Sequence, residues 1–331
     1  VGPPVGGFLT TYFSWRWIFW INLPMGILGI VLATLFIADT REEGVAPLDV
    51  PGFLLTALGL TGVVFGFEAA GRSILPNHVV ALLLGVGAVA LRLYVLHARR
   101  AFHPIIDLSL LRIPTFRASV AGSFLFRIGI GASPFLLPLM FQEGFGLDPL
   151  HSGMLTFASA AGALTMKFTA GPILRRFGFR PILIGNALLG GALLAASGLF
   201  RQTTPGWLIL AVLLIGGFFR SLQFTSMNVI AYAELPTARM SKATSFTSMA
   251  QQLSASVGVG IGALMLHLTL TARGGDHLVS SDFWPAFLAV GGIASLAALV
   301  FLPLPLDSGA ELSGRRPAAA MAKMTPAPDG D

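Results

Sequence analysis

The sequence contains no cysteine. This absence excludes disulfides, thiol catalysis, cysteine-ligated zinc, c-type haem and iron–sulfur clusters held by cysteine. Charge is also scarce, because Asp, Glu, Lys and Arg make up 11% of the residues where a soluble domain carries about 25%. A soluble fold with so little charge could not cover its surface. Most of the chain, which is 54% hydrophobic, is therefore predicted to be surrounded by lipid.

Several short motifs are missing as well. No Gly-Lys pair occurs, which excludes a P-loop and its ATP site, and there is no His-Glu-x-x-His zinc helix. The six histidines are scattered, without an apparent Ser/His/Asp constellation. No basic segment followed by a short apolar core is present, so no signal peptide is predicted. The prediction is a protein that is not an enzyme and has neither a metal nor a cofactor.

Charged residues divide the sequence into apolar runs of about 20 residues, the length that crosses a bilayer as a helix. Residues 1–13 are predicted to be the end of a truncated helix. Nine complete spans follow, at 17–38, 50–67, 78–96, 116–141, 150–174, 181–200, 207–231, 243–270 and 283–304. The fold class is therefore an all-α polytopic membrane protein.

The basic residues give the orientation of these spans. One set of alternate connections holds Arg41, Arg99, Arg100, Arg112, Arg117, Arg175, Arg176, Arg180, Arg239, Lys242, Arg315, Arg316 and Lys323. The other set holds only Arg16, Arg72, Arg201 and Arg273. Because cytoplasmic loops are enriched in Lys and Arg, the first set is predicted to be cytoplasmic. The net charge of +6 therefore reflects topology and does not indicate nucleic-acid binding.

Connection lengths divide the chain further. The longest cytoplasmic gaps, 38–50 and 96–116, bracket a helix pair with little polar content. We predict the end of an N-terminal bundle at 1–38, a central helix pair with its preceding loop at 39–97, and a six-helix bundle with its preceding loop at 98–304. Residues 305–331 are rich in Pro, Ala and charge, and are predicted to be a disordered cytoplasmic tail.

The first 26 residues carry a long motif. Gly2, Gly6 and Gly7 are small residues at helical spacing, which on its own predicts close helix packing. The string GPPVGGFLTTYFSWRWIFWINLPMG, however, resembles the antiporter motif and following turn of the fourteen-helix drug:H+ antiporters (EmrB/QacA type) of the major facilitator superfamily. The matching positions are Gly2, Pro3, Gly6, Gly7, Trp15, Trp17, Ile18, Phe19, Ile21, Asn22, Pro24 and Gly26.

This resemblance implies a fold of six N-terminal, two central and six C-terminal helices, of which the first four and the start of the fifth are not in this sequence. It implies alternating access that exchanges protons for amphipathic drugs, with the proton gradient in place of a cofactor. It also implies the inner membrane of a bacterial cell and, in Gram-negative cells, a periplasmic adaptor and an outer-membrane channel.

A second motif occupies 171–180, GPILRRFGFR, which we predict to be a tight cytoplasmic loop. It is similar to a loop motif of the superfamily, with matches at Gly171, Arg176, Gly178 and Arg180. Arg175 stands where that motif has Asp, so the sequence departs from the motif at the position of its charge relay. The alternative interpretation is a basic turn that only follows the distribution of positive charge.

Ionisable residues inside spans predict a functional site, because lipid does not tolerate them. Arg127 and Arg220 lie near the middle of their spans, and Pro134 and Pro138 should bend the span that contains Arg127. Helical spacing places polar side chains near both arginines. The predicted cavity is lined by Arg127, Arg220, Gln223, Asn228 and Gln251.

Alternatives remain for both the residues and the function. These polar residues could serve only as interhelical hydrogen bonds, and Lys167, the further coupling candidate, could extend to the cytoplasmic interface. An exporter of an anionic metabolite would suit the buried arginines, and a non-transporting membrane sensor could use the same fold. A membrane enzyme or channel is disfavoured, because the sequence has neither a catalytic cluster nor a repeated pore segment.

Overall fold

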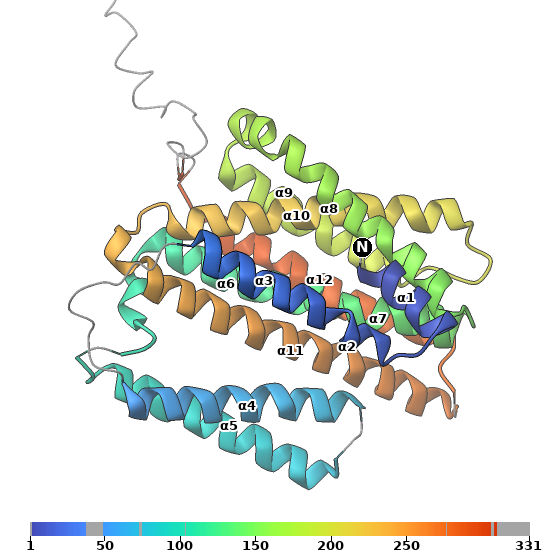
Figure 1. Cartoon of the computed structure of the whole chain (residues 1–331), viewed down its shortest axis with the longest axis horizontal. Helices are drawn as coiled ribbons and strands as arrows, with labels where there is room; N and C mark the ends of the chain where they lie inside the picture. Colours follow the sequence, from blue (N-terminus) through green and yellow to red (C-terminus); the bar gives the residue numbers. More distant parts are fainter. Residues whose placement is uncertain are drawn as a thin grey trace, which may run out of the picture.

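The computed structural model describes residues 2–37, 49–72, 75–102, 104–275, 277–305 and 308–309, and in these residues it consists of helices and short connections (Figure 1). The longer helices are α1 (Gly2–Tyr12), α3 (Asn22–Phe36), α4 (Val50–Arg72), α5 (Asn77–Ala98), α6 (Pro114–Gly131), α8 (Pro149–Phe177), α9 (Phe179–Ser197), α10 (Gly206–Tyr232), α11 (Met240–Arg273) and α12 (Phe283–Phe301). Between them lie the shorter elements α2 (Trp17–Trp20), η1 (Leu108–Arg112), α7 (Ser133–Leu139), η2 (Met140–Gly144), η3 (Thr237–Arg239) and η4 (Ser280–Asp282).

Eight segments of the described chain are long and apolar enough to cross a membrane: Trp17–Phe36, Val50–Ala70, Asn77–Ala98, Pro114–Gly144, Phe179–Ser197, Gly206–Tyr232, Met240–Arg273 and Ser280–Phe301. They correspond to eight of the nine predicted spans. The ninth, 150–174, coincides with α8, which has 29 residues but is not among these eight. The predicted all-helical, polytopic fold is confirmed.

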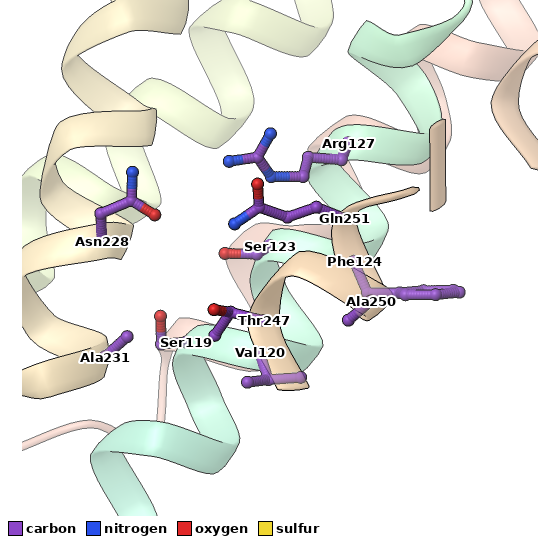
Figure 2. A pocket seen from close by; sticks show the side chains of 10 residues that line it. All are labelled: Ser119, Val120, Ser123, Phe124, Arg127, Asn228, Ala231, Thr247, Ala250 and Gln251. Atoms are coloured by element: carbon purple, nitrogen blue, oxygen red, sulfur yellow. The ribbon is translucent and has the colours of Figure 1, made fainter. Parts of the chain in front are cut away.

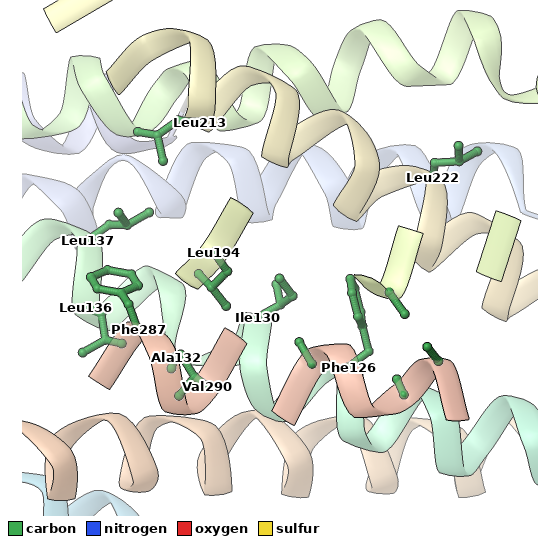
Figure 3. Packing of buried hydrophobic residues seen from close by; sticks show 14 of the residues in the cluster. Phe126, Ile130, Ala132, Leu136, Leu137, Leu194, Leu213, Leu222, Phe287 and Val290 are labelled. Atoms are coloured by element: carbon green, nitrogen blue, oxygen red, sulfur yellow. The ribbon is translucent and has the colours of Figure 1, made fainter. Parts of the chain in front are cut away.

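The helices α6 and α8–α12 pack as one bundle around α6. Helix α6 contacts α10, α11 and α12, while α8 packs along α10 and α9 packs along α12. The core between these helices is apolar, and Figure 3 shows Ile130 of α6 near Leu194 of α9, in the same cluster as Phe126 of α6 and Val290 of α12. Helices α4 and α5 form a separate pair beside this bundle, and α4 packs against α11 (Figure 1).

Glycines occupy the points where the helices cross. A Cβ built on Gly191 of α9 would lie 2.5 Å from the carbonyl oxygen of Gly291 on α12, and one built on Gly129 of α6 would lie 2.3 Å from that of Val290. Helices in lipid gain little from the hydrophobic effect and associate through such close backbone contacts.

The span that contains Arg127 is broken. Helix α6 ends at Gly131 and α7 begins at Ser133 after a one-residue turn at Ala132, and the segment then passes into the π-helical turn η2. Pro134 and Pro138 lack the backbone N–H that a continuous helix needs at their positions. The helix is interrupted where the prolines predict a bend, and the bend itself stays a prediction.

A second apolar cluster attaches the connection between α5 and α6 to the bundle. Leu110 and Phe116 are fully buried in it with Tyr94 of α5 and Phe246 of α11. The Tyr94 hydroxyl accepts a hydrogen bond from the Ile106 N–H (2.7 Å) and donates one to the Ile106 carbonyl (3.0 Å).

The predicted domain boundaries, after residues 38, 97 and 304, stay predictions. The loop residues 38–48, and the tail apart from residues 305, 308 and 309, lie outside the described residues.

Asp49 caps α4 and joins it to α5. One of its carboxylate oxygens accepts a hydrogen bond from the Gly52 N–H (3.0 Å) and lies 2.8 Å from His97 Nε2. Burial raises the pKa of Asp49, but the bonds from Gly52 and His97 outweigh it, so its pKa lies below the usual value. A carboxyl group with a lowered pKa stabilises the fold above its unfolded pKa and loses that contribution as the pH falls through its folded pKa.

We therefore expect Asp49→Ala to lower the thermal midpoint near neutral pH by an amount equivalent to about 1 kcal/mol, since an N-cap is lost. The difference from the parent protein should shrink once the pH falls below about 4. Thermal unfolding in detergent at both pH values measures it. Asp49→Asn, which keeps a capping side chain, should lose less, and a deficit that is independent of pH would contradict the assignment.

Candidate functional site

A polar pocket lies where α6, α10 and α11 meet. It is lined by Ser119, Val120, Ser123, Phe124, Arg127, Asn228, Ala231, Thr247, Ala250 and Gln251. Figure 2 shows Arg127 and Gln251 reaching from neighbouring helices toward the space in front of Asn228. The free volume is about 10 Å³, close to what a single water needs. Three of the five predicted cavity residues, Arg127, Asn228 and Gln251, are therefore brought together.

Arg127 supplies the positive charge of this pocket. Its guanidinium carbon lies 4.2 Å from the centre of the Phe224 ring, a cation–π distance. Its Nε is buried and has no hydrogen-bond partner among the described residues, and no carboxylate of those residues lines the pocket. A desolvated cation without a counter-charge is costly. The geometry therefore favours an electron-rich or anionic group beside Arg127.

The serines are already hydrogen-bonded, whereas the amides are available. Ser119 Oγ donates to the Met227 carbonyl (2.7 Å), and Ser123 Oγ lies 3.2 Å from Met227 Sδ. The side-chain amides of Asn228 and Gln251 make no hydrogen bond to another described residue. Each amide offers both a donor and an acceptor, so a bound molecule could use both.

Sequence reasoning missed Ser119 and Ser123 as members of this site. A signal was present, because Ser119, Ser123 and Arg127 follow one another at intervals of four and so share one face of α6.

The other two predicted cavity residues lie elsewhere, which corrects the five-residue prediction. Gln223 is fully buried, and its Nε2 donates to the Leu183 carbonyl of α9 (3.1 Å). Arg220 donates to Ser159 Oγ of α8 (2.9 Å) and lines a second pocket. Helix α10 is surrounded by α6, α8 and α9, so residues three positions apart on it meet different neighbours.

Lys167 lies apart from both pockets. Its side chain is exposed on α8, in agreement with the alternative that it extends toward an interface.

The glycines of the first motif lie at the contact between α1 and α8. Gly7 is buried, and a Cβ built on it would lie 2.5 Å from the Pro149 carbonyl oxygen. Gly2 and Gly6 would meet no described atom within 4 Å, and for Pro3 only the backbone is described. Within this motif, the close approach of two backbones therefore depends on Gly7.

The predicted loop at 171–180 is wrong in its extent. Helix α8 continues through Gly171, Pro172 and Arg176 to Phe177, and α9 begins at Phe179. Only Gly178, with φ of +77°, separates them. Pro172 is tolerated because membrane helices satisfy the freed carbonyl through neighbouring groups.

Two arginines of this motif lie near the helix ends. The Arg180 guanidinium donates to the Leu302 carbonyl at the end of α12 (2.7 Å), and that of Arg176 lies 5.6 Å from the centre of the Phe177 ring. Arg180 therefore ties the start of α9 to α12.

The sequence is similar to a family of known proteins and to individual proteins. The sequence matches the Major Facilitator Superfamily over residues 1–259 and again over residues 119–323. It is 36% identical over 318 residues to an Escherichia coli O7:K1 protein, and 34% identical over 316 residues to a Salmonella heidelberg protein; both carry the provisional name multidrug resistance protein MdtD. Each alignment covers 93% of this chain and 66% of the relative.

These matches extend over most of the sequence. The chain is a multi-pass membrane protein and belongs to the major facilitator superfamily.

Proposed function

We propose that this chain is part of a secondary active exporter that exchanges protons for drugs or other amphipathic small molecules. The observation that carries the proposal is the pocket at Arg127, where a guanidinium, two amides without hydrogen-bond partners among the described residues and an aromatic ring meet between three membrane spans. Amphipathic molecules need such a combination of polar anchors and apolar walls. The name that the relatives carry, multidrug resistance protein, supports drugs as the cargo.

Alternating access explains why the pocket is nearly closed. Binding near mid-membrane requires helices to move against one another around the site. Two features support such movement. The span that carries Arg127 is interrupted at Ala132 and again at η2, and α1 packs on α8 with Gly7 at the closest approach of the two backbones among the glycines of the motif.

The location and partners belong to the same proposal. The excess of Lys and Arg on one set of connections supports a cytoplasmic C-terminal tail. The bacterial relatives support the inner membrane of a bacterial cell. In a Gram-negative cell, export would continue through a periplasmic adaptor and an outer-membrane channel.

Proton release from energised inside-out vesicles that contain the full-length gene product tests this function. We expect an amphipathic cationic or neutral drug to release protons from the vesicle lumen. Arg127→Gln should reduce that release about tenfold or more, since a hydrogen bond to a charged group contributes about 1.5–3 kcal/mol. Arg99→Gln, which changes an exposed arginine just beyond the C-terminal end of α5 and outside its membrane span, is the matched control and should release protons normally.

A second candidate cargo follows from the same arginine. Because no carboxylate of the described residues lines the pocket, an organic carboxylate could supply the missing negative charge. If such an anion releases protons in these vesicles and drugs do not, the cargo is anionic. If neither does, at normal expression, the proposed export function is wrong.

A further inference from the structure

Arg220 is a cation near the middle of the span Gly206–Tyr232, and it is not part of the pocket at Arg127. It projects from α10 toward α8, and one of its terminal nitrogens donates to Ser159 Oγ at 2.9 Å. Its side chain is partly buried. A guanidinium inside a membrane bundle requires either an acceptor-rich or an anionic partner.

The pocket around Arg220 offers donors and lacks an anion. It is lined by Ile130, Ser133, Leu137, Ser159, Gly190, Leu193, Leu194, Ser197, Val212, Leu213, Gly216, Gly217 and Arg220. No carboxylate of the described chain is among these residues. Ser197 already donates to the Leu193 carbonyl (3.0 Å). The remaining polar groups, Ser133, Ser159 and Arg220, therefore decide what the pocket can bind.

Their hydrogen atoms are largely unused. Ser159 Oγ accepts from Arg220, which leaves its own hydroxyl hydrogen without an acceptor among the described residues, and Ser133 makes no side-chain hydrogen bond to a described residue. Arg220 has five N–H groups. One of them donates a hydrogen bond within the described chain, to Ser159 Oγ. Several donors thus face one small space.

The size of that space limits the ligand. The pocket has a free volume of about 30 Å³, whereas a water requires about 10–15 Å³. A monatomic anion is only slightly larger than water and would fit. Organic carboxylates and drug-sized molecules are larger than this free volume, so in this state of the protein the pocket can hold only a small ion or water.

We propose that this pocket binds a single small inorganic anion, chloride under cellular conditions, held by the Arg220 guanidinium and the hydroxyls of Ser133 and Ser159. The anion neutralises the buried cation and joins three elements, since Ser133 begins α7, Ser159 lies on α8 and Arg220 lies on α10. The proposal does not depend on the export function, because it concerns a fixed ion of the bundle.

Thermal unfolding of the purified full-length protein in detergent tests it. Sodium chloride, sodium bromide and sodium gluconate are compared at equal ionic strength, with tryptophan fluorescence as the readout. We expect chloride and bromide to raise Tm by about 2–4 °C or more over gluconate, because a ligand that binds only the folded state stabilises it. Radioactive chloride should bind at one ion per chain.

Variants assign the effect to these residues. Arg220→Gln should remove the difference between chloride and gluconate. Ser133→Ala should keep the fold and require about tenfold more chloride for the same rise in Tm. This variant still tests the proposal if Arg220→Gln does not fold. Arg127→Gln is the matched control for another intramembrane arginine and should retain the chloride effect.

Three outcomes would overturn the proposal. The first is an equal Tm of the parent protein in chloride and gluconate, which would mean that water fills the pocket. The second is a chloride effect that persists in both Arg220→Gln and Ser133→Ala. The third is a chloride effect lost in Arg127→Gln and kept in Arg220→Gln.

Discussion

Replacing Gly217 with valine is expected to prevent the bundle from folding into a stable, monodisperse protein. A Cβ on Gly217 would lie 2.0 Å from the Ser159 carbonyl oxygen. A Cβ on the facing Gly162 would lie 1.9 Å from the Leu214 carbonyl oxygen. Both obstacles are backbone atoms, so neither can rotate away. Helices α8 and α10 would have to separate along their whole contact, which also disrupts the hydrogen bond from Arg220 to Ser159.

The smaller change Gly217→Ala gives a measurable version of this result. Overpacking typically costs about 1–3 kcal/mol, and we expect a fall in Tm of several degrees in detergent. Gly216→Ala is the matched control on the preceding residue, because its Cβ would have Leu193 Cβ as nearest atom, at 3.9 Å. Alanine favours the helix by about 0.5–1 kcal/mol, so the control should be neutral or slightly stabilised. Equal losses at both positions would contradict a close crossing of α8 and α10 at Gly217.

The spans and their order could be predicted because lipid imposes a simple rule. Apolar runs of one length, separated by charge, leave few alternatives. The same rule misled at 171–180, where Gly171 and Pro172 read as turn residues. Helix α8 passes through both and stops only at Gly178, whose positive φ ends it.

The candidate site could be predicted only in part. A row of polar residues on one face of a helix does not determine which other helices pack against that face. The sequence groups Arg127, Asn228 and Gln251 because each is polar and lies within a span, and the structure brings these three into one pocket. Gln223 and Arg220 were grouped with them because they share a stripe on α10. Within that stripe, Gln223 contacts α9 and Arg220 contacts α8. Only the packing of the helices in the bundle shows that these two residues have different neighbours.

Replacing Gly7 with valine is expected to abolish drug-driven proton release while the protein still folds. This prediction rests on the proposed function. Gly7 is buried against the start of α8, where a Cβ would lie 2.5 Å from the Pro149 carbonyl oxygen and 3.0 Å from Leu150 Cα. A larger side chain would wedge α1 away from α8 and make the state in which they are in contact inaccessible. An exporter that must pass through that state cannot complete its cycle.

Gly6→Val separates this effect from general damage to α1. A Cβ at Gly6 meets no described atom within 4 Å, so the neighbouring variant should transport like the parent protein. Spin labels on a cysteine-free background, at Tyr12 of α1 and Met154 of α8, which are 63% and 57% exposed, would report the separation directly. Gly7→Val should shift their distance distribution to longer values, and Gly6→Val should not. Normal transport by Gly7→Val at equal expression would contradict this prediction. It would show that α1 and α8 need not touch during the cycle.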